Sequence, residues 1–229
     1  IKEHGLGADV VSDGELKKVL SLGFEPNKIV YSGVGKKFEE LRFAISKNIL
    51  LINVESESEL NNIQKLANKL GKKVRVGLRL NPNIDAKTNT KISTGRMQDK
   101  FGLNSKDIIK ILNKFKNSRN IKIKCLSVHI GSQITKNEPY NNVLVAINKI
   151  LSKSNYKFEY IDLGGGMGIK YIKDNKKLDY SKLSKNIYKF SKKNNCKIIF
   201  EPGRSIVGNT AVLLTKVIYI KNNLNKKFI

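Results

Sequence analysis

The chain has few cysteines and no long apolar run. Its two cysteines, Cys125 and Cys196, lie in or beside apolar stretches and lack a CxxC spacing. This predicts buried, reduced thiols rather than a disulfide or a zinc site. No apolar run approaches the ~20 residues of a membrane span, and no secretory signal is visible. These features favour a cytoplasmic protein that does not contact a membrane.

Acidic residues and arginine are also scarce. Lys and Arg together number 44 against 19 Asp and Glu, which gives a formal charge of +25, and only 6 of the 44 are Arg. The charge alone suggests a nucleic acid or an anionic surface as partner. A nucleic-acid reader is expected to use more Arg, and the 38 Lys and 26 Asn fit a codon bias toward A and T. We therefore expect a solvated lysine surface and no nucleic-acid partner. A basic nucleic-acid-binding domain is the alternative, and it requires lysines clustered on one face.

Short apolar runs alternate with helical stretches. The seven runs are Ala8–Ser12, Lys28–Ser32, Leu50–Val54, Val74–Leu80, Ile123–His129, Phe158–Leu163 and Lys197–Phe200. The helical stretches are Gly14–Leu22, Lys36–Asn48, Ser58–Leu70, Pro139–Leu151 and Lys182–Lys192. This alternation predicts an α/β fold with a parallel sheet. A (β/α)8 TIM barrel has eight strands in about 250 residues, so we expect such a barrel with its first strand missing. An open doubly wound sheet is the alternative, but its functional residues would gather at one switch point.

The two ends of the sequence lead us to expect an excerpt of a longer protein. Residue 1 is not methionine, and a β-rich run, Ala211–Ile220, lies close to the other end. We expect an N-terminally truncated barrel domain over residues 1–208 and the beginning of a mostly β second domain over residues 209–229. The connection Asn81–Lys106 shows no clear period, and loops of that length are usually functional or disordered.

A glycine-rich loop follows the sixth apolar run. Gly164, Gly165 and Gly166 are consecutive, and Gly168 is close behind. Three consecutive glycines allow backbone N–H groups to converge on an anion. With the missing strand counted, this is the loop after strand seven, where barrels commonly bind phosphate. A tight turn is the alternative, and a dinucleotide site is disfavoured because the GxGxxG spacing is absent.

Glu201-Pro202-Gly203-Arg204 follows the last apolar run. The carboxylate is suited to holding a proton on a heterocyclic nitrogen, and the guanidinium to binding a carboxylate or phosphate. A mutual Glu201–Arg204 ion pair that stiffens the loop explains the same residues equally well.

Two further strand ends carry polar side chains. His129 ends an apolar run, and Ser132 offers a hydroxyl suited to a phosphate oxygen. A lone histidine in such a place is often a core residue, and without a second histidine or a cysteine pair nearby no metal site is expected. Arg79 lies in a strand whose face points into the barrel, so it needs an anionic partner. That partner is either a bound charge in the barrel mouth or a carboxylate such as Glu201.

A glycine-lined phosphate site, an aromatic nitrogen ring, an acidic partner for a pyridine nitrogen and a barrel together point to pyridoxal 5′-phosphate. Here the sequence resembles the diaminopimelate decarboxylases, in the alanine-racemase-like class of barrel-type decarboxylases that use this cofactor. The segments that carry the resemblance are GADVVSDGEL (Gly7–Leu16), YSGVGK (Tyr31–Lys36), NVES (Asn53–Ser56), RLNP (Arg79–Pro82), KISTG (Lys91–Gly95), KFG (Lys100–Gly102), HIGSQ (His129–Gln133), GGGMG (Gly164–Gly168) and EPGRSIV (Glu201–Val207).

The resemblance implies a role for each matching residue. His129 would stack on the cofactor ring and Glu201 would pair with its nitrogen, and these two are the expected catalytic residues. Arg204 would bind the distal carboxylate of the substrate, and Arg79 would lie near the cofactor's phenolic oxygen or His129. The full set of expected cofactor-binding residues is Arg79, His129, Ser132, Gly164, Gly165, Gly166, Glu201, Pro202, Gly203 and Arg204.

The implied reaction is the decarboxylation of meso-2,6-diaminopimelate to L-lysine and CO2, the last step of lysine biosynthesis, in a homodimer with shared active sites. The family's cofactor-linking lysine and its later cysteine have no match here, so the chain alone is expected to be inactive. Asn89 stands where the family usually has histidine, and Asp13 where it usually has glycine. Decarboxylases of ornithine, arginine or carboxynorspermidine are the nearest alternatives. A non-catalytic carrier barrel is another, which the β-rich run after Thr210 disfavours.

Overall fold

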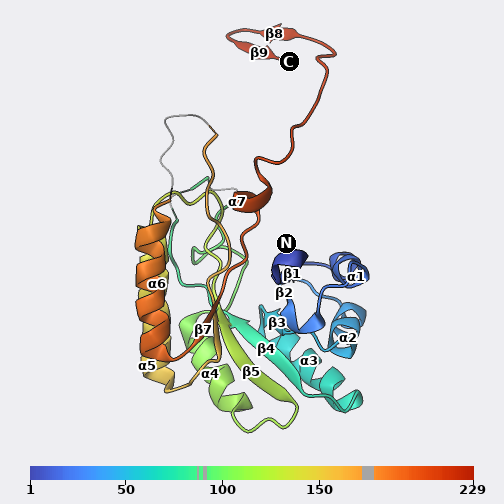
Figure 1. The fold of residues 1–229 in the computed structure, drawn as a ribbon, viewed down its shortest axis with the longest axis vertical. Coiled ribbons are helices and arrows are strands. Elements are labelled where there is room, and N and C mark those ends of the chain that lie inside the picture. Colours follow the sequence, from blue (N-terminus) through green and yellow to red (C-terminus); the bar gives the residue numbers. More distant parts are fainter. Residues whose placement is uncertain (87, 90–91, 172–177) are drawn as a thin grey trace.

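In the computed structural model, which describes residues 1–86, 88–89, 92–171 and 178–229, a curled parallel sheet forms the centre of the molecule (Figure 1). Over these residues the sheet has seven strands in sequence order. They are β1 (Ala8–Val10), β2 (Ile29–Tyr31), β3 (Leu51–Val54), β4 (Val74–Arg79), β5 (Ile121–Ser127), β6 (Tyr160–Asp162) and β7 (Lys197–Ile199). Every neighbouring pair is parallel. The predicted α/β barrel architecture with seven strands is confirmed.

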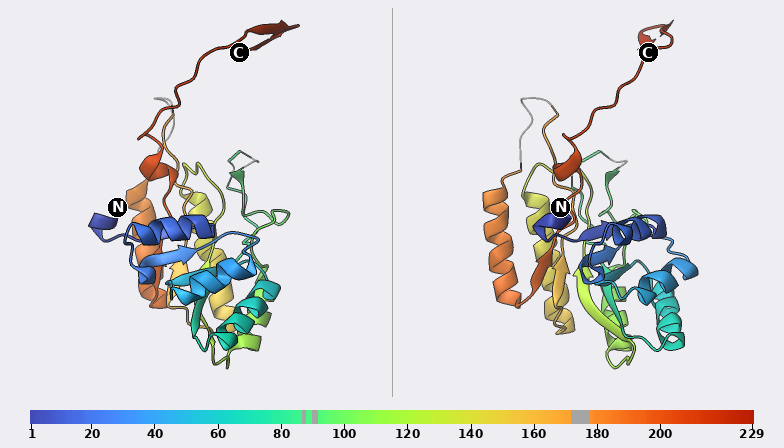
Figure 2. Two further views of the ribbon diagram at one scale, coloured as in Figure 1. Left: turned by 90° about the vertical axis from the view of Figure 1, so that its right-hand side faces the viewer. Right: turned by 45° about the vertical axis from the view of Figure 1, so that its right-hand side comes forward.

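Helices connect the strands and pack around the outside of the sheet (Figure 2). They are α1 (Asp13–Ser21), α2 (Phe38–Ser46), α3 (Glu57–Lys69), α4 (Ser105–Phe115), α5 (Glu138–Ser154), α6 (Tyr180–Asn194) and α7 (Arg204–Val207), with short 3-10 turns η1 (Lys2–His4) and η2 (Pro26–Lys28). Helix α3 shows how the sequence specifies them. The Ser56 side chain accepts a hydrogen bond from the Glu59 N–H (3.2 Å) and caps the helix. One face is apolar at helical spacing and is buried: Leu60, Ile63, Leu66 and Ala67.

The two faces of the sheet bury different residues. The outward face packs against the helices in the large core, while Val30, Leu51 and Cys125 form a separate cluster inside the curl. This inner cluster fills the barrel below the carboxyl ends of the strands. Cys125 is a free, fully buried thiol, as predicted, and burial raises its pKa well above the usual value. Cys196 is also free, and it is half-buried.

Two segments differ from the sequence expectations. Helix α4 lies in a stretch to which the sequence analysis assigned no element. The run Ala211–Ile220 forms no strand, because nothing in the described part of the chain pairs with it; a two-stranded antiparallel hairpin, β8 (Lys221–Asn223) and β9 (Lys226–Phe228), follows it. The division at residues 208 and 209 stays a prediction. Lys91, in the KISTG segment, lies outside the described residues.

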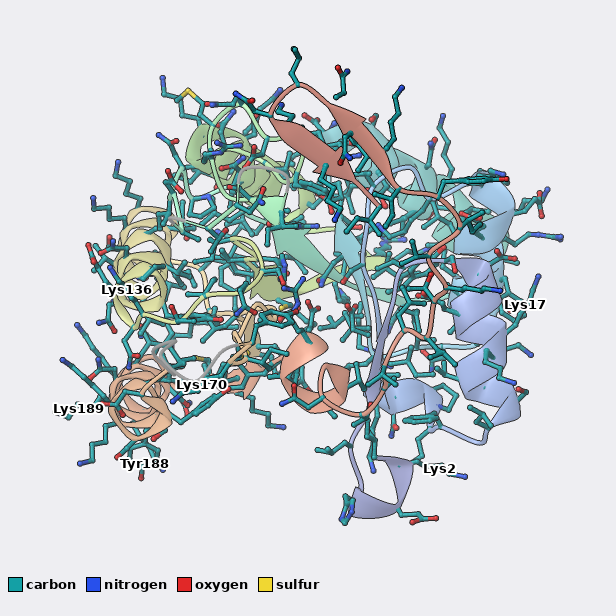
Figure 3. All side chains as sticks on the ribbon, turned by 90° about the horizontal axis from the view of Figure 1, so that it is seen from above. Lys2, Lys17, Lys136, Lys170, Tyr188 and Lys189 are labelled. Carbon is teal, nitrogen blue, oxygen red and sulfur yellow. The ribbon has the colours of Figure 1, made fainter. Side chains whose placement is uncertain are left out.

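Lysine side chains project from many sides of the molecule. Figure 3 shows Lys17 on one side, Lys136 and Lys189 on the opposite side, and Lys2 at a third edge. The nucleic-acid alternative requires lysines gathered on one face, so this distribution does not support it. No helix among the described residues is long and apolar enough to cross a membrane.

Candidate active site

Polar side chains from five strands meet at the carboxyl ends of the sheet. Asn53 of β3 donates from Nδ2 to Ser32 Oγ and to Asp162 Oδ2, both at 3.1 Å. The Ser32 hydroxyl donates to Glu201 Oε1 at 3.4 Å. Asp9 of β1 lies beside the same group and hydrogen-bonds to Ser32. Three carboxyl groups therefore share one mouth, because the curl of the sheet brings β1 close to β6 and β7; Asp162 is fully buried, Glu201 is half-buried and Asp9 is exposed.

The three carboxyl groups perturb one another. Burial, and next the charge of Asp162, raises the pKa of Asp9 to about 7, although the hydrogen bond from Ser32 opposes this. Burial together with the charges of Asp162 and Asp9 raises the pKa of Glu201 well above its usual value. Burial also raises the pKa of Asp162. Carboxyl groups crowded in a poorly solvated site cannot all be ionised, so this mouth holds protons near neutral pH and favours a cationic or proton-accepting ligand atom.

His129, two residues beyond β5, presents a neutral imidazole to this mouth. The Gly165 N–H donates to His129 Nδ1 at 3.1 Å, so the neutral ring carries its proton on Nε2. Burial, and next the charge of Arg79, lowers the pKa of His129 to about 4. The imidazole is therefore an uncharged flat surface at physiological pH.

The glycine loop, Gly164–Gly168, packs closely against two other loops, one at Glu201 and one at Gly131. A Cβ on Gly165 would overlap the carbonyl oxygen of Glu201, and a Cβ on Gly166 would overlap that of Gly131. Glu201 N–H also donates to Gly164 O at 2.9 Å. From behind, the buried Tyr140 hydroxyl of α5 donates to Gly165 O at 2.8 Å. The glycines are needed here because only residues without a Cβ allow these backbones to approach so closely.

Arg79 ends β4 and has a carboxylate partner. Its Nη1 lies 2.6 Å from Glu55 Oε1, and its guanidinium stacks over the Phe101 ring at 4.7 Å from the centroid. Of the two partners considered from sequence, the structure thus shows a carboxylate other than Glu201. The charge of Arg79 still lowers the pKa of both His129 and Glu201, so it acts on the mouth from its edge.

Arg204 begins α7 and is held by Gln133 rather than by Glu201 in the described structure. Its Nη1 lies 3.4 Å from Gln133 Oε1. The Gln133 amide pairs with both backbone groups of Ile169, at 2.6 Å and 3.2 Å. The alternative of a mutual Glu201–Arg204 pair is therefore not observed, and the guanidinium keeps donors for an anionic ligand.

A cavity of about 750 Å³ opens between β1 and β7. Asp9, Glu201, Pro202 and Gly203 line it, and Tyr160 and Ile199 close its lower side. A Cβ on Gly203 would meet nothing within 4 Å, so the turn after β7 faces open space. The structure thus brings Glu201, the glycine loop and His129 to one end of the barrel, with Arg79 and Arg204 at its margins.

Sequence reasoning missed several polar residues of this site. They are Asp9, Ser32, Asn53, Glu55 and Asp162. All but Asp9 stand within one residue of the end of a predicted strand, and this position is the signal that could have found them, because parallel strands end at the same edge of a barrel. Asp9 lies inside the first predicted strand, so its position alone does not mark it. No group of three or more His, Cys, Asp or Glu in the described residues is arranged to hold a metal ion.

Sequence comparisons find similar proteins along nearly the whole chain. The family model for the pyridoxal-dependent decarboxylase, pyridoxal binding domain, matches residues 1–208. Diaminopimelate decarboxylase of Zymomonas mobilis is 41% identical over 234 residues, with 99% of this chain and 55% of that protein covered. The Aquifex aeolicus enzyme of the same name is 40% identical, with coverages of 99% and 55%. The chain thus spans about half the length of the curated relatives it matches.

Solved structures share the fold. Helicobacter pylori diaminopimelate decarboxylase, complexed with L-lysine, superposes with a TM-score of 0.88 at 38% identity, over 96% of this chain and 56% of that one. An arginine decarboxylase of Paramecium bursaria Chlorella virus, bound to agmatine, superposes with a TM-score of 0.71 at 23% identity, over 88% of this chain and 52% of that one. The viral enzyme supports the fold alone.

Proposed function

This chain belongs to the pyridoxal-dependent decarboxylases, and we propose that the whole protein decarboxylates meso-diaminopimelate to L-lysine and CO2 with pyridoxal 5′-phosphate as cofactor. One observation of the structure carries the proposal. The buried Glu201 carboxyl group, with its raised pKa, shares the barrel mouth with the neutral His129 ring and the glycine loop. Identities of 36–41% to curated diaminopimelate decarboxylases along nearly the whole chain support the choice of substrate.

The residues of the mouth fit this cofactor. The glycine loop, Ser132 and the open turn at Gly203 would hold the phosphate, because they combine small backbone surfaces with a hydroxyl and N–H donors. The imidazole of His129 would stack on the ring and Glu201 would face its nitrogen. The wider set of proposed cofactor-binding residues is Arg79, Gly164, Gly165, Gly166, Pro202 and Arg204.

Glu201 would hold a proton at the ring nitrogen of the cofactor. When bound, pyridoxal phosphate supplies the electron sink that stabilises the carbanion left by loss of CO2. Burial and the charges of Asp162 and Asp9 raise the pKa of Glu201 well above its usual value, so its carboxyl group would share a proton with the ring nitrogen of the bound cofactor. The charge that Asp9 and Asp162 carry when they are ionised would favour a protonated ring nitrogen beside Glu201. His129 stays neutral throughout and does not compete for the proton.

Arg204 is the proposed substrate-binding residue. Its guanidinium lies at the margin of the mouth, held on one side by Gln133, and can pair bidentately with a carboxylate. Diaminopimelate has a distal carboxylate, whereas ornithine and arginine carry only cationic groups there. We further propose residues 1–208 as the cofactor-binding domain, residues 209–229 as the start of a second domain, and a cytoplasmic homodimer with shared active sites; the resemblance to the family supports these assignments.

Glu201→Gln in the whole protein tests the proposal. Glutamine keeps the shape but cannot hold the ring nitrogen as a cation, so we expect the cofactor to bind and turnover of diaminopimelate to fall by ~10²-fold or more. The matched control is Glu57→Gln, since Glu57 lies on the exposed side of α3 and pairs with Lys114 at 2.7 Å. Visible absorbance measures cofactor binding, and lysine formation measures turnover. Wild-type turnover in Glu201→Gln, or no cofactor band in the wild type, would overturn the proposal.

A further inference from the structure

The connection after β4 includes a stretch, segment 92–103, that joins two parts of the candidate site. At one end, the Thr94 hydroxyl donates to His129 O at 2.7 Å and the Ser132 N–H donates to Ile92 O at 3.2 Å. Ser93 also forms an antiparallel bridge with Gly131. The segment therefore lies along the loop that carries His129 and Ser132, and its placement affects both residues.

At its other end the segment is bound by Glu55, just beyond β3. The Gly102 N–H donates to Glu55 Oε2 at 2.7 Å, while Glu55 Oε1 pairs with Arg79 at 2.6 Å. The two carboxylate oxygens thus connect the segment to the end of β4. Gly102 has a φ of 75°, and a Cβ there would lie 2.8 Å from Asn81 N, so the close approach of its N–H to Glu55 depends on glycine.

Glu55 is itself held in place by a buried ion pair next to it. Its backbone N–H donates to Glu59 Oε2 at 2.8 Å. The other oxygen of Glu59 pairs with Lys36 Nζ at 2.7 Å, and the same ammonium group donates to Asn53 O at 2.7 Å. The Lys36 side chain is only 1% exposed and that of Glu59 only 9%. Both charged groups of this buried Lys36–Glu59 pair have hydrogen-bond partners, so the pair holds the backbone of Glu55 in a fixed position.

We propose that Glu55 is a positioning residue: by bridging Arg79 and the Gly102 amide, it holds segment 92–103 against His129 and Ser132 and so sets the wall of the cofactor site. The role in the reaction rests on the proposed function, whereas the anchoring of the segment does not. Loss of the bridge leaves the Gly102 N–H without its acceptor and Arg79 without its carboxylate, and it loosens the contacts that Thr94 makes with His129. The backbone bonds between Leu103 and the end of β4 remain (Leu103 N to Arg79 O, 2.7 Å; Asn81 N to Leu103 O, 2.8 Å).

The test is Glu55→Gln in the whole protein. Glutamine preserves the length of the side chain and one acceptor oxygen, but it offers an N–H where a second acceptor is needed. The matched control is again Glu57→Gln, whose carboxylate pairs with two lysines of α4, Lys110 at 3.4 Å and Lys114 at 2.7 Å. Two measurements on the cofactor-free protein report the anchor: amide exchange at Gly102, and tryptic cleavage after Arg96 and Lys100.

We expect exchange and cleavage to accelerate about tenfold or more in Glu55→Gln, as for the loss of a charge-assisted hydrogen bond that limits opening. Glu57→Gln is expected to match the wild type. In the cofactor-bound protein, Glu55→Gln is expected to change the visible circular dichroism of the cofactor, whereas Glu57→Gln is expected to leave it unchanged. Wild-type exchange and cleavage in Glu55→Gln would overturn the anchor, and an unchanged dichroism band would overturn its effect on the site. If the wild type binds no cofactor, the proposed function fails while the exchange result still decides the anchor.

Discussion

Replacing Asp9 by Asn should make the cofactor-free protein more stable at neutral and alkaline pH. Asp9 shares the barrel mouth with Asp162 and Glu201, and its pKa is raised from 3.8 to about 7. A carboxyl group with a raised pKa contributes stability that is fully present below the unfolded pKa and is lost as the pH rises through the folded pKa. Asparagine has no proton to lose, so the variant avoids that loss.

The structure gives the size of the effect. A pKa unit corresponds to about 1.36 kcal/mol, but Asp9 is exposed to solvent, so screening reduces the effect of its shift from 3.8 to about 7 and we expect about 1–2 kcal/mol. The difference between Asp9→Asn and wild type should be small near pH 4, rise between pH 4 and pH 7, and then level off. Asparagine also alters the hydrogen bond with Ser32 and relieves Glu201 of a neighbouring charge.

Urea unfolding of the whole protein at pH 5, 6, 7 and 8 measures this difference. The control is Asp13→Asn in α1, because the hydrogen bond from Lys17 lowers the pKa of that exposed carboxyl group. Its contribution to stability is present above the unfolded pKa and changes only in acid, so the control should run parallel to the wild type over this range. With cofactor bound, the positive ring nitrogen should reduce the gain from Asp9→Asn. Parallel curves for Asp9→Asn and wild type without cofactor would refute the reasoning.

Three further predictions follow from particular contacts. Lys36→Met should cost about 3–5 kcal/mol of unfolding free energy, because it leaves Glu59 buried without its partner. The control Lys17→Met removes one partner of an exposed i,i+4 pair and should cost at most ~0.5 kcal/mol. Thermal unfolding compares the two variants, and equal losses would contradict a structural role for the buried Lys36–Glu59 pair. Gly165→Ala should cost about 1–3 kcal/mol by overpacking and weaken cofactor binding, and a variant as stable as the wild type would show that the loop has room for a methyl group. The His129 imidazole, with a pKa of about 4, should keep its Nε2–H form in nitrogen NMR spectra from pH 5 to pH 8, and a titration within that range would contradict its assigned neutral state.

The sequence was sufficient to predict the strands because each is a short apolar run between helices of regular period. Helix α4 was missed although its signals are present. Asn104 caps it by accepting from the N–H groups of Lys106 and Asp107, and its apolar residues recur at helical spacing. The connection predicted over Asn81–Lys106 overlaps only the first two residues of the helix, and no element was predicted between it and the run that begins at Ile123.

The contents of the mouth were only partly predictable. Glu201 and His129 stand in short motifs whose chemistry is specific. Asp162 lies near Glu201 because β6 pairs with β7, whereas Asp9 comes from β1, and only the curl of the sheet brings that strand close to Glu201. The sequence also left the partner of Arg79 open. The charge of Arg79 requires a carboxylate, and the structure shows that this carboxylate is Glu55, just beyond β3, rather than Glu201.

Carboxyl-labelled substrates distinguish meso-diaminopimelate from the other two candidate substrates. The whole wild-type protein, loaded with pyridoxal phosphate, would be given meso-diaminopimelate, ornithine and arginine in turn, and released CO2 and the product amine would be measured. The account predicts release from diaminopimelate with L-lysine in equal amount, little release from the other two, and loss of that preference in Arg204→Gln. Faster release from ornithine or arginine, or none from diaminopimelate, would contradict it.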